Sequence, residues 1–185
     1  MAYHNESHDD DDADAPKPRV PRIDPPLPDD PLAARLVQAS WMGTGLLAVT
    51  AIPAAIAPDT FVTPAVVVSL VLFVAGTVAF LWAYVVAIGR SRADLIGMGG
   101  LFFLAGSAPR SVQQSLWASF AIEVVVAVAT ASSRIFTPLA FGVLAPMFGL
   151  GIMGLWGAKF GTFPTRPADP VRPGRRRTPA KSDPS

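Results

Sequence analysis

The chain has 185 residues, of which 51% are hydrophobic, 15 are Lys or Arg, 14 are Asp or Glu, and none is Cys. This length suits one domain, and the apolar content is too high for an ordinary soluble one. Without cysteine the chain can form no disulfide, thiol nucleophile or cysteine-based metal site. The formal net charge of +1 says little about partners, because the acidic residues gather near the start and the basic residues near the end.

Charged and apolar residues occupy separate stretches of the sequence. Nearly all charge falls before residue 36, between residues 90 and 110, or after residue 158. The runs between these blocks can cross a hydrocarbon layer of ~30 Å, which takes about 20 helical residues. We therefore predict an all-α, polytopic membrane protein whose transmembrane domain, residues 35–162, has four spans, at about 36–57, 63–88, 112–131 and 136–158.

The N-terminal head, residues 1–34, combines a run of Asp with seven prolines. It cannot bury enough apolar surface to offset the entropy of ordering, so we expect it to be disordered. A signal peptide is not expected, since polar residues instead of a short basic region precede the first apolar run. His4 and His8 could bind a divalent metal weakly, but no ligand geometry is preformed there. We predict a solvated head without a metal site.

The first two predicted spans lie close together in the sequence. Span 36–57 is expected to bend near Pro53, and a tight loop with the sequence PDTFVTP follows it. Segment 93–109 has only ~14 apolar residues, too few to cross, so we expect an interfacial or re-entrant piece. The alternative is a loose cytoplasmic loop packed under the bundle.

The last predicted span, 136–158, contains two prolines and five glycines. Membrane helices tolerate proline where neighbours satisfy the freed backbone groups, and we expect a kink near Pro146. The basic tail, residues 163–185, is predicted to be disordered like the head.

The orientation follows from the Lys and Arg beside each span. Basic residues flank the N-terminus, the link between the second and third spans, and the tail, whereas the other two connections hold only Arg134. By the positive-inside rule, both termini are predicted to be cytoplasmic, in a plasma or inner cell membrane. The four tryptophans, Trp41, Trp82, Trp117 and Trp156, all fall near predicted cytoplasmic ends, as expected for headgroup-level rings.

Glu123 is the only charged residue well inside a predicted span. At ~1.5 Å per helical residue it lies roughly 20 Å from Arg110 and 16 Å from Arg134, near the bilayer centre. An ionised group there costs about 2.5–3.5 kcal/mol, so Glu123 should face protein or water. Ser115, Ser119 and Glu123 recur at steps of four and form a polar stripe toward the bundle or a partner.

Two interpretations of Glu123 remain. It could be a proton or cation site, the default for intramembrane carboxylates. Alternatively, a protonated Glu123 donates a hydrogen bond between helices, a contact worth about 0.6–2 kcal/mol. The second is favoured, because no other intramembrane charge extends a relay.

Small residues at helical spacing indicate close helix packing. The second span carries Ala75, Ala79, Ala83 and Ala87, and the fourth carries Gly142, Pro146 and Gly149. We expect these faces to pack inside one bundle, with homo-oligomerisation as the alternative.

Motifs for enzymes are missing from the sequence. It has no HExxH, no phosphate-binding GxxxxGK, and no paired intramembrane carboxylates. We expect no catalytic residues, no cofactor, no metal and no nucleic-acid partner, and a lipid bilayer as the surroundings.

The block at residues 106–164 reads GSAPRSVQQSLWASFAIEVVVAVATASSRIFTPLAFGVLAPMFGLGIMGLWGAKFGTFP. By general appearance it resembles small, uncharacterised four-helix membrane proteins of high-GC actinobacterial type, and this implies a membrane location but no activity. Four spans with one buried glutamate are also similar to the small multidrug exporters. Those carry the coupling glutamate in the first helix, where this chain has none, so that role does not transfer to Glu123.

Three functional hypotheses follow. The chain could be a non-catalytic structural or accessory component of a membrane complex, which we favour. It could be a small proton- or cation-coupled transporter using Glu123. It could also be a regulatory protein that signals through its charged tails.

Overall fold

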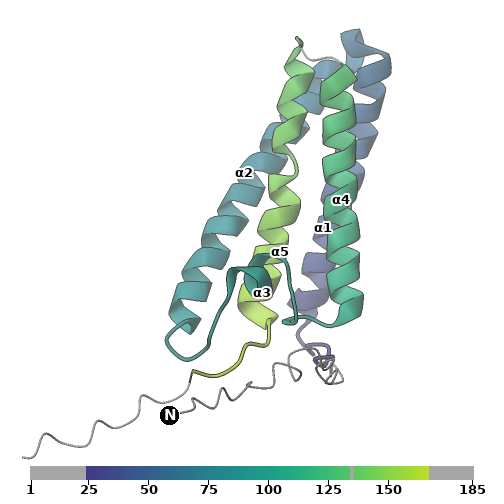
Figure 1. Cartoon of the computed structure of the whole chain (residues 1–185). Helices are drawn as coiled ribbons and strands as arrows, with labels where there is room; N and C mark the ends of the chain where they lie inside the picture. The colour runs from purple at the N-terminus through teal and green to yellow at the C-terminus, as the bar shows by residue number, and fades with distance from the viewer. Residues whose placement is uncertain (1–23, 134–135, 167–185) are drawn as a thin grey trace, which may run out of the picture.

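The computed structural model describes residues 24–133 and 136–166 as a bundle of long helices (Figure 1). The elements in chain order are α1 (Pro31–Ile56), α2 (Pro58–Arg90), α3 (Met98–Phe102), α4 (Arg110–Ser133), the 3₁₀ helix η2 (Pro138–Leu144) and α5 (Met147–Phe160). The predicted head and tail are partly structured, because α1 already begins at Pro31 and described backbone continues to Arg166. The remainder of both tails, including His4 and His8, and Arg134 of the last connection lie outside the described residues.

The predicted fold class is confirmed. Within the described ranges, four segments are long and apolar enough to cross a membrane, namely Pro31–Ile56, Pro58–Arg90, Arg110–Ser133 and Pro138–Phe160. The chain is therefore a multi-pass membrane protein with an all-α architecture.

The loop expected between the first two spans is absent. Only Ala57 separates α1 from α2, because α2 begins at Pro58. Proline suits the first position of a helix, where its fixed φ is already helical and its missing N–H would have no partner. Pro53 does not end α1, because the helix continues to Ile56. Ala57 N still donates to Pro53 O at 2.8 Å, which is the helical i to i−4 pattern.

The fourth span is broken rather than kinked. Its first half is the 3₁₀ helix η2, and α5 begins just after Pro146. Pro146 has no N–H to donate to the oxygen of Gly142, four residues earlier. That oxygen accepts from Ala145 N at 3.0 Å instead, which is the tighter 3₁₀ pattern. The break leaves a new helix N-terminus inside the bundle.

Helix α5 lies between α2 and the pair formed by α1 and α4 (Figure 1). Its contact with α2 is made by backbone, since a Cβ on Gly76 would overlap Met147 O and Phe148 N, and a Cβ on Gly151 would overlap Gly76 O. Glycine at these positions lets two membrane helices approach closely.

The packing face predicted for α2 needs one correction. Ala79, Ala83 and Ala87 are buried, but Ala75 is exposed and Gly76 takes its place. A step of four residues advances about 40° beyond a full helical turn. Ala75 is three such steps before Ala87, so around the helix axis it points about 120° away from the direction of Ala87. Gly76 points within about 20° of that direction.

Segment 93–109 folds back against the bundle beside α5 (Figure 1). Leu101, Phe102 and Leu104 are buried, and the rings of Phe102 and Phe80 stack with centroids 4.7 Å apart. The segment is therefore packed against the helices and not a loose loop. Its interfacial position in a bilayer stays a prediction.

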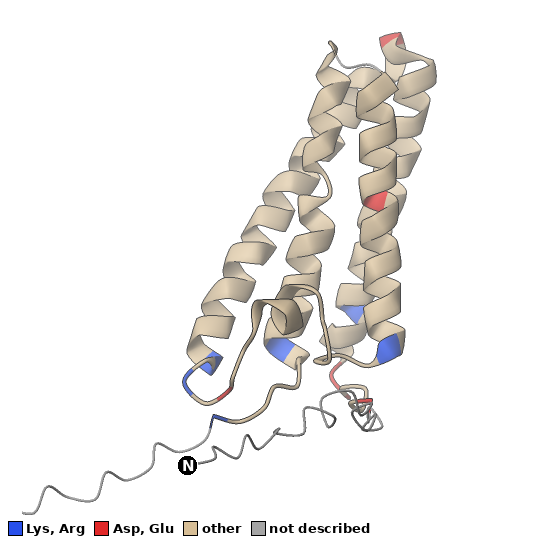
Figure 2. Ribbon diagram, viewed as in Figure 1, with Lys and Arg blue, Asp and Glu red and all other residues tan. Residues whose placement is uncertain are grey.

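Most charged residues of the described ranges lie at one end of the bundle (Figure 2). The Lys and Arg residues lie at the end where the described chain begins and ends, together with Asp24, Asp29, Asp30 and Asp94, and we call it the basic end. Asp59 lies in the first turn of α2, at the opposite end, and Glu123 lies in the middle of α4.

Candidate functional site

Glu123 projects from the middle of α4 into the bundle and is 0% exposed. Both oxygens of its carboxyl group accept hydrogen bonds, so Glu123 links helices as an acceptor and not as the donor expected from the sequence. Thr44 Oγ1 of α1 donates to Oε1 at 3.1 Å, and the backbone N–H of Gly149 in α5 donates to Oε2 at 3.0 Å. One side chain thus joins three membrane helices.

The contact with Gly149 follows from the break in the fourth span. Gly149 is the third residue of α5, and the first N–H groups of a helix have no partner within it. The oxygen of Glu123 supplies that partner and lies at the positive end of the helix dipole. A Cβ on Gly149 would lie 2.7 Å from Oε2 and 3.0 Å from Phe120 Cδ2, so a larger residue would displace the carboxyl group from this position.

A cluster of hydroxyl groups continues from Glu123 toward the basic end. Ser119 Oγ lies 2.7 Å from both Thr44 Oγ1 and Ser40 Oγ. Thr44 Oγ1 also lies 3.0 Å from Ser40 O. Ser40 and Ser119 are fully buried. This cluster, Ser40, Thr44, Ser119 and Glu123, forms the polar seam between α1 and α4.

Ser115 is near the seam in sequence but has a different contact. Its Oγ accepts from Trp41 Nε1 at 2.9 Å, in a partly exposed pair. The polar stripe of α4 therefore faces α1 along its length. The sequence did not lead us to Ser40 and Thr44, although these two hydroxyl residues lie one helical turn apart in α1.

Gly142 and Pro146, which were also predicted to be packing residues, lie at the break in the fourth span. Gly142 is buried near Thr130 and Ser69, with hydroxyl oxygens 3.8 and 3.9 Å from the position of a Cβ. Pro146 forms the N-cap position of α5. These residues shape the helix break that lies opposite Glu123.

The chemistry available in the described bundle is limited. No group of three or more His, Cys, Asp or Glu that could hold a metal ion occurs among residues 24–133 and 136–166. Glu123 has no exposed surface for a substrate, and its oxygens are occupied by protein donors.

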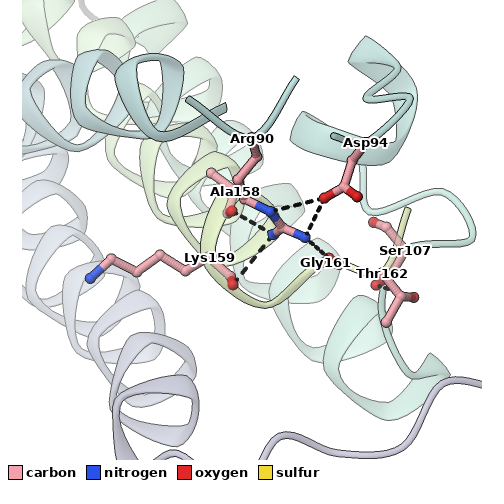
Figure 3. Close-up of polar contacts among 7 residues, drawn as sticks. All are labelled: Arg90, Asp94, Ser107, Ala158, Lys159, Gly161 and Thr162. Atoms are coloured by element: carbon pink, nitrogen blue, oxygen red, sulfur yellow. Dashed lines mark hydrogen bonds and ion pairs between the residues drawn. The ribbon is translucent and has the colours of Figure 1, made fainter. Parts of the chain in front are cut away.

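A second polar cluster, the Arg90 clamp, lies at the basic end (Figure 3). The guanidinium of Arg90, at the end of α2, donates to Ala158 O at 2.8 Å and Gly161 O at 3.1 Å. Ala158 lies in the last turn of α5 and Gly161 is its C-cap, where carbonyl acceptors lack helical partners. Arg90 also pairs with Asp94 Oδ2 at 3.0 Å.

The clamp fixes the first residues after α5. Arg166 N donates to Ala93 O, and Leu95 N donates to Pro164 O, both at 2.8 Å. Thr162 N donates to Ser107 O at 2.9 Å (Figure 3). The link between α2 and α4 and the start of the C-terminal tail therefore form one structure. In the sequence, Arg90 indicated only the orientation of the chain in the membrane.

Cavities open on the surface of the described bundle, and two of them lie along the long helices. A groove of about 560 Å³ lies along α1 and is lined by Ala39, Met42, Gly43, Gly45, Leu46, Val49, Leu72 and Phe148. Another cavity, of about 340 Å³, lies at the basic end and reaches Trp156.

Comparison of the chain with protein-family models, curated proteins and solved structures finds no match. The resemblance of residues 106–164 to small membrane proteins therefore stays a prediction.

Proposed function

We propose that this chain is a non-catalytic structural or accessory component of a membrane complex. The observation that carries the proposal is the state of Glu123, whose two oxygens both bind protein donors in a fully buried position. A coupling carboxylate has to exchange its proton or ion with solvent. Glu123 instead joins α1, α4 and α5, which supports an anchoring role over transport.

A partner helix would bind along α1. Most small-residue faces are used within the bundle, because Gly76, Gly151 and Gly157 all meet backbone atoms. The groove along α1 is different, since a Cβ on Gly45 would meet nothing within 4 Å. We assign this groove to a transmembrane helix of the partner, which could insert an apolar side chain there.

The partner proposal is tested by mild-detergent purification and identification of stoichiometric companions. Gly45→Leu would fill the groove without an internal clash, and Gly89→Leu is the matched control, since it also has open space around it. We expect Gly45→Leu to lose the companion and Gly89→Leu to keep it. A proton or cation flux in liposomes that requires Glu123 would refute the accessory role.

We also propose that the basic end faces the cytoplasm of a cell whose plasma or inner membrane holds the protein. The gathering of Lys and Arg at that end supports this orientation. Because the chain has no cysteine, single substitutions can report it. Asp59→Cys should react with an impermeant maleimide on intact cells and Ala93→Cys should not; the reverse pattern would overturn the orientation.

A further inference from the structure

Segment 93–109 connects two membrane-spanning helices at the basic end. Helix α2 ends at Arg90 and α4 begins at Arg110, so the segment starts and finishes where spans leave the hydrocarbon layer. The Arg90 clamp ties its first residues to the chain that follows α5. A segment held at this level of a membrane protein can contact the headgroups and upper acyl chains of the surrounding lipid.

Large apolar side chains remain exposed on this segment. Leu95 and Phe103 are each 46% exposed, and Met98 is 66% exposed. The ring of Phe103 also stacks on Trp117 of α4, with centroids 5.7 Å apart. Apolar and aromatic side chains at the headgroup boundary gain free energy by entering the layer of acyl chains, as those of interfacial helices do. The segment therefore has the apolar surface that contact with lipid requires.

The charges next to these side chains leave an excess of positive charge. Asp94 pairs with Arg90 at 3.0 Å, so these two charges compensate each other (Figure 3). Arg92 and Arg166 are exposed, and neither forms an ion pair with another described residue. The start of α1, which holds the other acidic residues of the basic end, lies on the far side of α5 from α2 (Figure 1). Two uncompensated cations thus remain beside the segment.

The backbones of these two arginines are held close together. Arg166 N donates to Ala93 O at 2.8 Å, and Asp94 and Thr165 form an antiparallel bridge. A cavity of about 300 Å³ opens beside this bridge, with Leu95 and Arg166 in its lining. A basic residue and an apolar residue therefore meet at one hollow, as the phosphate and the first acyl carbons of a phospholipid do.

We propose that Arg92, Arg166 and the exposed apolar side chains of segment 93–109 form a binding surface for anionic phospholipids. The headgroup phosphate binds at the two arginines, and the upper part of the acyl chains packs against Leu95 and Met98. Anionic headgroups are favoured over zwitterionic ones, because no described acidic residue compensates the two cations. The inference concerns lipid preference, needs neither the partner helix nor the cytoplasmic orientation, and goes beyond the accessory role.

The test places a fluorescent label on the segment. Because the chain has no cysteine, Met98→Cys gives one exposed attachment site for bimane in the full chain. The protein is reconstituted in phosphatidylcholine vesicles with a small fraction of nitroxide lipid, either phosphatidylglycerol or phosphatidylcholine, that carries the nitroxide near the ester carbonyl. The nitroxide quenches bimane only where the lipid contacts the label.

The expected preference follows from the two cations. Each basic residue near an anionic surface is worth about fivefold in association. Phosphatidylglycerol should therefore associate with the labelled segment at least about fivefold more strongly than phosphatidylcholine. The preference should fall at ~1 M salt, where the Debye length is only ~3 Å.

Matched variants separate this surface from a general attraction of lipid to charge. Arg92→Gln and Arg166→Gln should each lower the ratio of the two association constants at least about twofold, and together bring it close to one. Arg35→Gln removes one exposed cation of the same end from α1 and should leave the ratio unchanged. A label at Ile56→Cys, a site 79% exposed at the opposite end of α1, should show no preference for phosphatidylglycerol.

Three outcomes would overturn the proposal. An unquenched label on the segment would show that water or protein covers it instead of lipid. Equal quenching by both lipids would show contact without selection. An equal fall of the ratio for Arg35→Gln would show that the total charge of the basic end, and not this surface, selects the lipid.

Discussion

Replacing Glu123 with leucine removes both acceptors that join α4 to its neighbours. The N–H of Gly149 would then be buried without a partner, at a cost of about 1–3 kcal/mol. Thr44 keeps Ser40 O and Ser119 as partners, so its lost contact adds only the ~0.6 kcal/mol typical of interhelical hydrogen bonds in membranes. We expect Glu123→Leu to lower the free energy of unfolding by about 2–4 kcal/mol.

Glutamine at position 123 should cost much less. Its amide oxygen can accept from Gly149 N, and its NH₂ group can donate to Thr44 Oγ1, because a hydroxyl oxygen also accepts. We expect Glu123→Gln to lose no more than about 1 kcal/mol, within the range measured for interhelical hydrogen bonds. The comparison isolates the acceptor from the carboxylate charge.

The assay is unfolding by sodium dodecyl sulfate in mixed micelles, followed by helical circular dichroism. Val125→Leu is the matched control, because Val125 lies on the same helix and is 65% exposed. It should unfold like the unaltered chain. Equal losses for glutamine and leucine would show that the charge matters instead of the acceptor, and a neutral leucine variant would refute the anchoring role.

The remaining predictions concern helix packing and the Arg90 clamp. Gly76→Ala should destabilise the bundle by at least about 1–3 kcal/mol, because its Cβ meets the backbone of α5, whereas Ala75→Leu should be nearly neutral in the same unfolding assay. Destabilisation by Ala75→Leu alone would reverse our assignment of the buried face. Arg90→Ala should speed hydrogen exchange of the Arg166 amide by tenfold or more, since it removes donors to α5 carbonyls worth at least about 1.5 kcal/mol. Arg92→Ala, which is exposed, should leave that exchange unchanged, and an equal effect of both would show that general charge holds the tail.

The four spans could be predicted because crossing a bilayer requires a long apolar helix, which shows in the sequence as a continuous run of apolar residues. The inward direction of Ser119 and Glu123 also follows from the sequence. The energetic cost of exposing them to lipid is high, and the helical period places them on one line.

Contacts between distant segments leave no such local pattern. Gly149 and Glu123 are 26 residues apart, and Arg90 reaches carbonyls 68 and 71 residues away. The 3₁₀ helix before Pro146 was missed because hydropathy is the same for both kinds of helix. Ala75 was misplaced because steps of four drift from the true helical period.

The single-residue connection at Ala57 bears on how the protein enters the bilayer. If the basic end faces the cytoplasm, as proposed above, the turn between α1 and α2 has to cross the hydrocarbon layer during biogenesis. Almost no polar loop travels with it, and Asp59 is the one charged side chain of that turn. Carrying such a residue through the membrane centre costs about 2.5–3.5 kcal/mol, which two long apolar helices inserting together as a hairpin readily offset.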